Sequence, residues 1–584
     1  MQYENKKLLE RYAYVYGWNA DDEDSVCRQA DSDYRKYEET QKVFLLSDIL
    51  DGSLLKEIEE NTNLFENLPH KKIPIYLYFS NNSIFNLFLH KVKIEPLLKN
   101  ERVVFLIGER ILGQYFEDMQ TLIPKEVFGY HYQKVRNKLN EVIRIRNNRV
   151  AETIKEANDF YRENGHKVRE HIISGTPRIL LIKHRFSQVI RNHTRDCNDA
   201  LKRLGYNTFV SEEKSDISRI YRIVDINKYK PDIIIDIDEL RYSYRKQAPS
   251  EIIYVAWVQD DYPHIMNEEM AKRLGRNDYL MNHFISDNRL VNLGYSKDRI
   301  LDATICANAE VYKPYNLTDD EKSMYQADIC LLSHNADFDK FIEESVGWLS
   351  VDETVSEAVR QFLISYCKDF KQNGEASRQK EVFLNKMISY LEEVRQNAIS
   401  RDVLENFVNE IHNGLHLRLY RQTLADWILG AGYTNVKLWG EEWTHLEKFK
   451  LYAMGEAENG ETLSKILQSS KIVIGNNFFV TACARAWESM LSGTLYMSND
   501  VPEKEDKANI RKIMTENENL VIFHDKTDLL NKIDFYLKHE DERRRIVEKG
   551  RKKALATTTS DATMKKVMEF VTKSMEEQRG AEDC

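Results

Sequence analysis

Short apolar runs alternate with amphipathic stretches along most of this chain. Most of the runs end at glycine, asparagine or a charged residue. They occupy residues 73–79, 102–108, 179–182, 230–238, 251–261, 327–335, 435–443, 471–477, 494–498 and 519–525. Near-continuous apolar strands separated by helices are typical of parallel sheets that are covered on both faces. The pattern therefore predicts an α/β protein.

Three segments depart from this alternation. Residues 133–164 form one long helical stretch with many basic side chains, which fits either a solvated connector or a basic docking face for an anionic partner. Residues 310–326 are polar, and we interpret them as a linker. Residues 338–430 are almost purely helical, with Val355, Val359 and Phe362 at helical spacing. This last segment predicts a helical insertion whose main role is packing.

The amino-acid composition limits the classes of protein to which the chain can belong. The chain has 584 residues, of which 42% are apolar and 30% charged, and its net charge is -10. These values fit a folded protein of about three or four domains, with no broad nucleic-acid binding. Seven cysteines are scattered singly, and no run reaches the roughly 18–20 apolar residues of a membrane span. We therefore expect a cytoplasmic protein without disulfides, a zinc cage or an integral membrane segment.

Ligands in open parallel sheets bind beyond the carboxyl ends of the strands, so the loops after each strand are where chemistry is expected. The strand at 471–474 leads into Gly475, Asn476 and Asn477, and a short helix with Arg485 and Glu488 follows. A helix amino terminus and an arginine suit a phosphate, and a carboxylate suits the hydroxyls of a ribose. The plain alternative is an ordinary i, i+3 helix pair followed by a C-cap at Gly493.

The order of these motifs resembles a known family. The helix "RAWESMLSG", the strand "TLYMS" and the tail "NLVIFHDKTDLLNKIDFYLKHEDERRRIVEKG" are similar to the donor-binding half of GT-B glycosyltransferases, and most similar to the spore-maturation-type, family 1-like group. The resemblance is strongest over residues 436–552 and looser over 178–314. It does not cover the first ~170 residues or the helical insertion.

The resemblance implies a GT-B architecture, in which two Rossmann-like domains face a cleft. Residues 171–320 would be the N-terminal, acceptor-side domain. Residues 321–584 would be the C-terminal domain that binds the nucleotide-sugar donor and carries the helical insertion, 338–430. Residues 1–170 would be an extra α/β accessory domain with the long connector helix, serving acceptor recognition or oligomer contacts.

The resemblance also implies roles for donor-side residues. Glu488 would hold the donor ribose, Trp439 and Gly440 would lie against the base, and Ser333, His334 and Lys340 would lie near the diphosphate with Arg485. Many retaining members carry a second glutamate eight positions before the ribose-binding one, where this chain has Val480. Stereochemistry therefore stays open, and Asn476, Asn477 or Thr481 become candidates for contacting the sugar.

Acceptor-side candidates follow the strands of the first Rossmann-like half. Asp260, Asp261 and His184 are the candidate catalytic bases, and Arg185 and His264 are candidate acceptor contacts. The aspartate pair could equally cap a helix. The nearest match to a metal-binding Asp-x-Asp is Asp236 to Asp238, in the wrong context, so we expect neither a metal nor a cofactor beyond the nucleotide-sugar co-substrate.

The sequence thus predicts a metal-independent, Leloir-type glycosyltransferase. It would move a sugar from a nucleoside-diphosphate sugar to a glycan or protein acceptor, in bacterial surface polysaccharide synthesis or protein glycosylation. Two alternatives stay open, a nucleotide-sugar epimerase and a non-catalytic scaffold that kept the fold.

Overall fold

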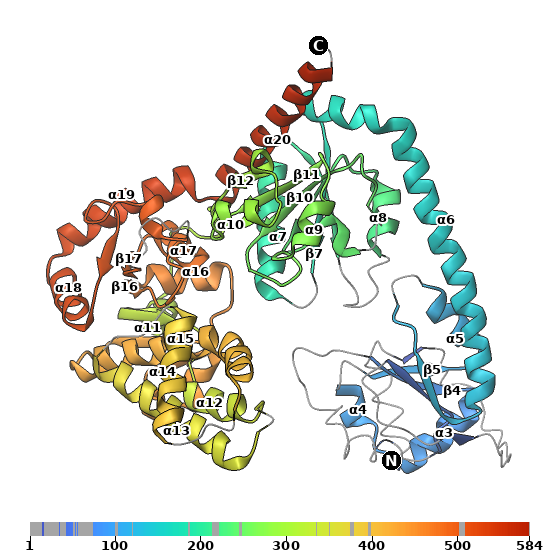
Figure 1. The fold of residues 1–584 in the computed structure, drawn as a ribbon, viewed down its shortest axis with the longest axis horizontal. Coiled ribbons are helices and arrows are strands. Elements are labelled where there is room, and N and C mark those ends of the chain that lie inside the picture. The colour runs from blue at the N-terminus through green and yellow to red at the C-terminus, as the bar shows by residue number, and fades with distance from the viewer. Residues whose placement is uncertain are drawn as a thin grey trace. The chain divides into compact units, whose positions relative to one another are not determined.

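A computed structural model gives the fold (Figure 1). It describes residues 15–16, 34–35, 43–50, 53, 55, 74–99, 103–118, 121–184, 187–212, 221–244, 248–334, 336–349, 351–373, 379–394, 399–501 and 508–582. The chain divides into two compact units: residues 1–194 with 206–255 and 275–278, and residues 195–205 with 256–274 and 279–584. Three six-stranded sheets, each with helices between its strands, confirm the predicted α/β class.

The first sheet lies in the N-terminal region and has the strand order β1-β5-β4-β3-β6-β2. Its strands are β1 (Val15–Tyr16), β2 (Tyr34–Arg35), β3 (Phe44–Ser47), β4 (Ile75–Phe79), β5 (Val103–Ile107) and β6 (Glu126–Tyr130). The helices between them are α3 (Asn82–Lys91), α4 (Glu95–Lys99) and α5 (Glu109–Glu117). Apolar clusters cover both faces of the sheet, which explains why β3, β4 and β5 are buried at every position.

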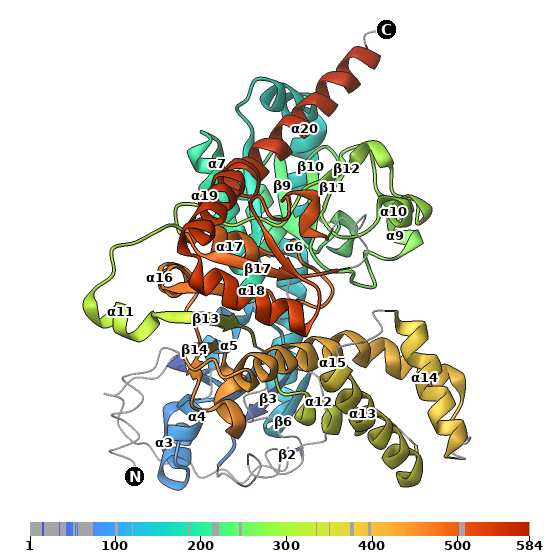
Figure 2. The same cartoon turned by 90° about the vertical axis from the view of Figure 1, so that its left-hand side faces the viewer.

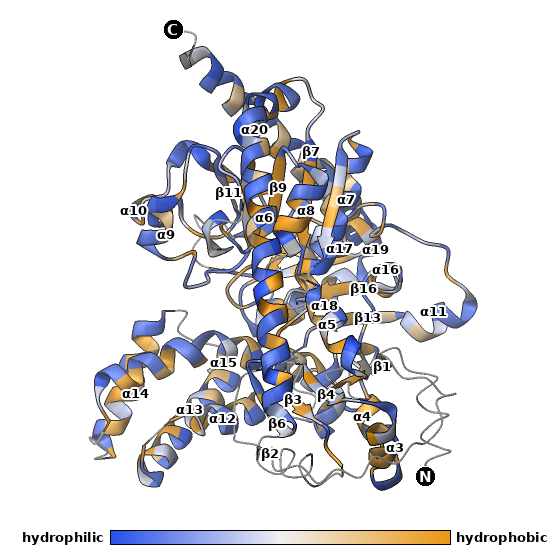
Figure 3. Ribbon diagram, turned by 90° about the vertical axis from the view of Figure 1, so that its right-hand side faces the viewer, coloured by the Kyte–Doolittle hydropathy of each residue, from blue (hydrophilic) through white to orange (hydrophobic). Residues whose placement is uncertain are grey.

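A 42-residue helix, α6 (Tyr132–Ile173), follows the first sheet. It is longer than the predicted stretch 133–164, because Gly165 does not end it. A Cβ on Gly165 would lie 2.8 Å from Cγ of Glu251, so the glycine permits a close approach instead. The helix stops before Gly175, which has a positive φ of 75°. Much of α6 is hydrophilic (Figure 3), but Val135, Leu139 and Val142 pack onto the first sheet.

The second sheet has the strand order β12-β11-β10-β9-β7-β8. Its strands are β7 (Arg178–Lys183), β8 (Asn207–Glu212), β9 (Ile233–Ile237), β10 (Ile253–Val258), β11 (Asp278–Asn282) and β12 (Ile300–Asp302). Its helices are α7 (Gln188–Arg203), α8 (Tyr221–Tyr229), α9 (Glu268–Arg273) and α10 (Asp287–Asn292). Strand β7 pairs in parallel with β8 and with β9, so the strand order reverses between β7 and β9.

The third sheet is parallel throughout and has the order β15-β14-β13-β16-β17-β18, which reverses between β13 and β16. Its strands are β13 (Ala327–Leu332), β14 (Val436–Trp439), β15 (Ala453–Gly455), β16 (Ser470–Ile474), β17 (Leu495–Asn499) and β18 (Val521–Phe523). Its helices outside the insertion are α11 (Asp319–Tyr325), α16 (Glu461–Gln468), α17 (Ala484–Ser492), α18 (Lys526–Lys538) and α19 (Glu540–Thr557). The expected polar linker, 310–326, therefore contains α11, which begins with a capping box formed by Thr318 and Glu321.

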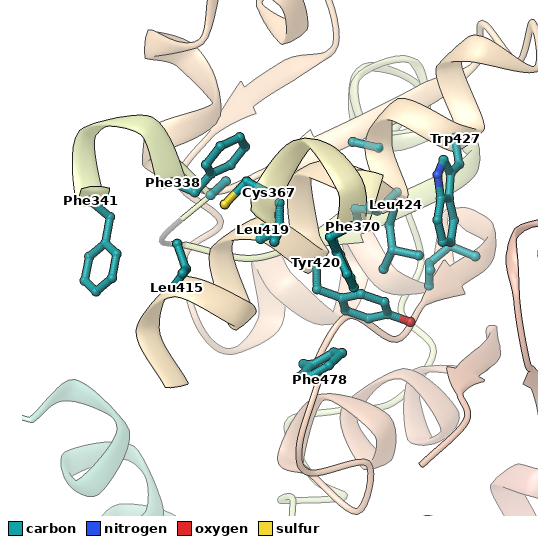
Figure 4. Close-up of a cluster of buried hydrophobic side chains, with 14 of the residues drawn as sticks. Phe338, Phe341, Cys367, Phe370, Leu415, Leu419, Tyr420, Leu424, Trp427 and Phe478 are labelled. Carbon is teal, nitrogen blue, oxygen red and sulfur yellow. The ribbon is translucent and has the colours of Figure 1, made fainter. Parts of the chain in front are cut away.

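The predicted helical insertion is confirmed and lies between β13 and β14 (Figure 2). It consists of α12 (Phe338–Val346), α13 (Glu353–Asn373), α14 (Lys380–Glu393) and α15 (Arg401–Gly430). Its core is continuous with one face of the third sheet, since Ile329, Leu331 and Ile472 belong to the same cluster. Figure 4 shows that this core also includes Phe478, from the loop after β16. The insertion thus packs directly on a loop of the predicted donor site.

The last helix, α20 (Ser560–Glu582), returns to the second sheet. The Tyr279 hydroxyl lies 2.8 Å from the Ser574 hydroxyl, and Lys566 donates to the Asp302 carbonyl oxygen. Among the helices within the described ranges, none is both long and apolar enough to span a membrane.

Candidate functional site

The strand order of the third sheet reverses between β13 and β16, and open parallel sheets bind ligands beyond the carboxyl ends of the strands at such a reversal. Two polar side chains are fixed at this point by one carbonyl oxygen. The Asn476 side-chain amide donates to the Leu332 carbonyl oxygen at 3.0 Å, and the Arg485 guanidinium donates to the same oxygen. Two of the predicted donor-side residues therefore lie together at the reversal of strand order.

Two glycines allow the backbone to close tightly around this point. Gly440 has a φ of 136°, and a Cβ there would lie 2.0 Å from the Ser333 carbonyl oxygen. A Cβ on Gly475 would lie 2.7 Å from the Tyr496 hydroxyl oxygen. Larger residues at either position would push apart the loops that follow β13, β14 and β16.

A second arginine, Arg421 on α15, lies beside Arg485. Its guanidinium donates to the His334 carbonyl oxygen. Burial, followed by the charges of Arg485 and Arg418, lowers the pKa of Arg421 to about 10. Within the described part of the chain, the Nε atoms of Arg421 and Arg485 are buried without a hydrogen-bond partner. Neighbouring guanidinium groups with unused donors are an arrangement that a bound anion would stabilise.

The amino end of α17 adds to this positive region. The helix begins after Cys483, whose side chain makes no capping hydrogen bond. Because α17 follows β16 in a parallel sheet, its amino end lies at the carboxyl edge of the sheet, where the helix dipole favours an anion. Sequence reasoning missed Arg421 because the insertion was interpreted as packing alone. The available signal was a pair of arginines, Arg418 and Arg421, on an otherwise apolar stretch of helix.

Glu488 lies on α17, next to the buried Tyr312. Part of the Glu488 side chain is exposed, but desolvation raises the pKa of its carboxyl group to about 7, against the lowering effects of Arg485 and of a hydrogen bond from Tyr312. The Tyr312 hydroxyl in turn accepts a hydrogen bond from Asn459 at 2.9 Å. Among the described residues, Arg485 and Glu488 make no ion pair, but the charge of Arg485 still acts on the Glu488 carboxyl group. Gly493 is the left-handed C-cap that the simple helix-pair interpretation expected.

The remaining donor-side candidates have structural contacts. Trp439 is buried and packs edge-on against Tyr325, with ring centroids 6.1 Å apart. Asn477 Oδ1 accepts from the backbone amides of residues 479 and 480 at 3.2 and 3.1 Å. The Thr481 hydroxyl accepts from the amide of residue 510 at 2.9 Å. These contacts shape the loops after β14 and β16.

Three further donor-side candidates differ in exposure. Ser333 is buried, and within the described residues its hydroxyl has no hydrogen-bond partner. His334 is exposed. Lys340 is an exposed residue on α12, and its ammonium group lies 3.8 Å from Glu344. Of these three side chains, Ser333 is the best candidate to bind a ligand, because its hydroxyl group, unbonded among the described residues, lies at the end of β13.

The acceptor-side candidates follow strands of the second sheet. His184 Nε2 lies 2.9 Å from Asp236 Oδ1, and Asp236 also accepts from Arg222 and Tyr254 at 2.8 Å each. Burial opposes ionisation of Asp236, but the charges of Arg222 and His184 outweigh it and lower the pKa. His184 thus belongs to a buried polar network at the reversal between β7 and β9.

The aspartate pair lies at the carboxyl end of β10. Asp260 and Asp261 are exposed. Desolvation and the charge of Asp261 raise the pKa of Asp260, which moves it toward the range of a general base. His264 stacks on Tyr262 with ring centroids 5.8 Å apart. Arg185 lies outside the described residues. In the ranges that the structure describes, no group of three or more His, Cys, Asp or Glu side chains is arranged to hold a metal ion.

Comparison with known families bears on the region just described. Residues 418–569 match the family model "Glycosyl transferase-like". The match includes Arg421, Asn476, Arg485 and Glu488, and it confirms the predicted likeness to glycosyltransferases over this segment. A search of curated proteins finds no significant match.

Solved structures of several glycosyltransferases are similar to the chain at low identity. A glycosyltransferase from Rickettsia africae is 12% identical, with a TM-score of 0.39, over 69% of this chain and 99% of that one. Sucrose-phosphate synthase from Thermosynechococcus elongatus is 11% identical, with a TM-score of 0.37, over 69% and 99%. HepE from Anabaena, in complex with UDP and glucose, is 10% identical, with a TM-score of 0.36, over 68% and 99%. Likenesses of this size assign neither donor nor acceptor.

Proposed function

We propose that this protein is a Leloir-type glycosyltransferase that transfers a sugar from a nucleoside-diphosphate sugar to a glycan or protein acceptor. The observation that carries the proposal is the pair of half-buried arginines, Arg421 and Arg485, at the strand reversal of the third sheet; among the described residues, the buried Nε atom of each has no hydrogen-bond partner. The family match over residues 418–569 supports glycosyl transfer as the activity. The biological setting that we propose is bacterial surface polysaccharide synthesis or protein glycosylation.

In this proposal the donor diphosphate lies against Arg421, Arg485 and the amino end of α17. Positive charge at these places would stabilise the negative charge that develops on the leaving diphosphate. We therefore propose transfer without a bound metal ion. Glu488 would accept hydrogen bonds from the donor ribose, and its ionised form would be the one that binds.

The acceptor hydroxyl needs a base that removes its proton as the new glycosidic bond forms. We propose Asp260 for this role, because its raised pKa suits a general base better than that of an ordinary exposed aspartate. His184 is the second candidate, although its contact with Asp236 also fits a purely structural role.

The test is nucleotide binding to the full chain. UDP, GDP, CDP and dTDP are titrated by calorimetry into the wild type, Arg421→Gln and Arg401→Gln. Arg401 is the matched control, since it lies on the same helix in an exposed ion pair with Glu381. We expect one diphosphate to bind the wild type and the control equally, and to bind Arg421→Gln at least about tenfold more weakly, for one lost charge-assisted hydrogen bond.

Two outcomes would contradict the proposal. Failure of all four diphosphates to bind would favour a non-catalytic scaffold. Isomerisation of the donor sugar in the absence of any acceptor would favour an epimerase.

A further inference from the structure

The N-terminal domain contains a cavity of about 670 Å³ at the carboxyl edge of the first sheet. Residues that follow β3, β4, β5 and β6 line it, together with the first turns of α3, α5 and α6. Within this sheet the order β5-β4-β3-β6 reverses between β3 and β6. The cavity therefore lies where open α/β sheets bind small molecules. The likeness to glycosyltransferases does not extend to this domain.

A carboxylate–imidazole pair bridges the reversal. Asp48 follows β3, His131 follows β6, and His131 Nδ1 lies 2.9 Å from Asp48 Oδ2. The other carboxylate oxygen accepts from the Ser80 amide at 2.6 Å. The Asp48 side chain is almost fully buried, whereas 27% of the His131 side chain is exposed. The buried carboxylate thus fixes an imidazole ring in the wall of the cavity.

The backbone around this pair is held in an unfavourable conformation. Asp48 and His131 have positive φ values of 47° and 57°. Gly129 approaches so closely that a Cβ there would lie 2.3 Å from the Ser47 carbonyl oxygen. Left-handed backbone at non-glycine residues persists only where the surrounding structure enforces it, and it is frequent at ligand sites.

Two carboxylates and two ammonium groups line the cavity, and His131 adds a positive charge only when it is protonated. Asp48 is paired with His131, and Glu109 is paired with Lys134 at 2.5 Å. Lys138 donates to the Glu109 carbonyl oxygen at 2.9 Å. Among the described residues it has no carboxylate within ion-pair distance. One ammonium group therefore keeps its charge beside the cavity.

Two helix amino ends strengthen this positive character. α3 and α5 have ten and nine residues, and both begin at the cavity directly after β4 and β5. The Asn81 side chain caps α3 by accepting from the Ile84 amide, and α5 carries Glu109 in its first turn. The N-cap of α5 is Gly108, which has no side chain to satisfy the first amides. Helix amino ends beside an ammonium group favour a phosphate over a carboxylate of the same charge, because a phosphate offers three oxygens to several donors.

The remainder of the cavity wall is apolar and suits the organic part of a ligand. Leu50, Ile84, Leu87, Leu112 and Val135 line it. Tyr78 also lines the cavity, and burial raises the pKa of its phenol, so the group stays a neutral hydrogen-bond donor or acceptor. A bare inorganic ion would leave most of this volume and apolar surface unused.

We propose that the N-terminal domain binds a small phosphate ester in this cavity. The phosphate lies against Lys138 and the amino ends of α3 and α5, and the organic part lies along the leucine-rich wall near His131. This site is separate from the proposed donor site, and its occupancy does not depend on the activity proposed above.

The test is calorimetric titration of the full chain with glycerol 3-phosphate, ribose 5-phosphate and phenyl phosphate, alongside inorganic phosphate and free ribose. The variants are Lys138→Ala and His131→Asn; asparagine tolerates the left-handed backbone of position 131. Lys167→Ala is the control, because Lys167 is exposed on α6 and, among the described residues, bonds only to Asn164. Arg421→Gln separates this site from the donor site.

We expect at least one ester to bind the wild type, the Lys167→Ala control and Arg421→Gln with equal affinity. Lys138→Ala should weaken that binding about tenfold or more, as expected for the loss of a charge-assisted contact. His131→Asn should weaken it while the melting temperature stays close to that of the wild type. Inorganic phosphate should bind more weakly than the best ester, and ribose should not bind.

Three results would overturn the proposal. The first is that no ester binds at millimolar concentration. The second is equal ester binding by Lys138→Ala and the wild type. The third is loss of ester binding in Arg421→Gln, which would place the ester at the donor site.

Discussion

Replacing Glu488 by glutamine is expected to stabilise the ligand-free chain, and more so as the pH rises. Burial raises the pKa of Glu488 from its ordinary value of 4.5 to about 7. Between pH 4.5 and about pH 7 the Glu488 carboxyl group keeps its proton in the folded chain but has lost it in the unfolded chain. A rising pH therefore favours unfolding. The contribution of the raised pKa to stability is fully present below about pH 4.5, the pKa of Glu488 in the unfolded chain. It is lost as the pH rises through about 7, the pKa of Glu488 in the folded chain.

The size of the effect follows from the shift. At about 1.4 kcal/mol per pKa unit, ionised Glu488 costs the folded state about 3 kcal/mol at pH values above 7. About 2 kcal/mol of this cost develops between roughly pH 5.5 and pH 8. Glutamine has no charge and does not titrate, so the stability gap between Glu488→Gln and the wild type should widen by that amount over this range.

Thermal unfolding at a series of pH values measures this gap. For a unit of this size, about 2 kcal/mol corresponds to a shift in melting temperature of about 3 °C. Glu488→Gln should melt above the wild type at pH 8, and the difference should shrink toward pH 5.5. A gap that is independent of pH, or one that closes as the pH rises, would refute the assignment of a buried, weakly ionised carboxyl group to this position.

Ligand binding should show the opposite preference. If the Glu488 carboxylate accepts two hydrogen bonds from a ribose, the wild type should bind its nucleoside diphosphate more tightly at pH 8 than at pH 6. Glu488→Gln should bind at least about tenfold more weakly at pH 8 and with little pH dependence. Equal affinities of the two proteins at pH 8, measured by calorimetry, would remove Glu488 from the donor site.

Three further predictions concern packing, backbone and chemistry. Phe478→Ala should lower the free energy of unfolding by about 3–5 kcal/mol in urea titrations and weaken nucleotide binding. The reason is that the ring anchors the loop after β16 in the core of the insertion. Unchanged binding would show that this loop does not contribute to the donor site. Gly440→Ala should lower the free energy of unfolding by about 3 kcal/mol or more, because its Cβ would meet the Ser333 carbonyl oxygen. The control is Gly430→Ala, which should melt at or slightly above the wild type, because a Cβ on Gly430 meets nothing within 4 Å. Asp260→Asn should lower kcat for transfer by about 10²–10⁴-fold and leave the Kd for the donor unchanged; undiminished turnover would exclude Asp260 as the base.

Local patterns predicted much of the secondary structure. The apolar runs at 471–474 and 179–182 became β16 and β7, and the segment 338–430 became the four helices of the insertion. These features depend on which residues recur within one strand or a few helical turns, so a linear pattern contains them. The long helix was predicted to end near residue 164, whereas α6 continues to Ile173; the contact that Gly165 permits comes from Glu251, far away in the sequence.

Local sequence patterns predicted only part of the candidate site. Asn476, Arg485 and Glu488 follow one strand, so their proximity to its carboxyl edge could be inferred from spacing alone. Arg421 reaches the same edge from α15, more than fifty residues earlier, and Tyr312 reaches Glu488 from the segment interpreted as a linker. No local signal joins these residues, and only the order of strands in the third sheet brings them together.

By itself, the sequence determined the α/β class and the helical insertion, and it placed one carboxylate and one arginine on the helix after β16, because hydrophobic periodicity and short motifs are properties of neighbouring residues. The tertiary structure alone decided which distant charges meet. It placed Arg421 beside Arg485 and Asp48 beside His131, each at a point where strand order reverses. Burial then set the pKa of Glu488 near 7, since desolvation depends on everything packed around a group and not on its neighbours along the chain.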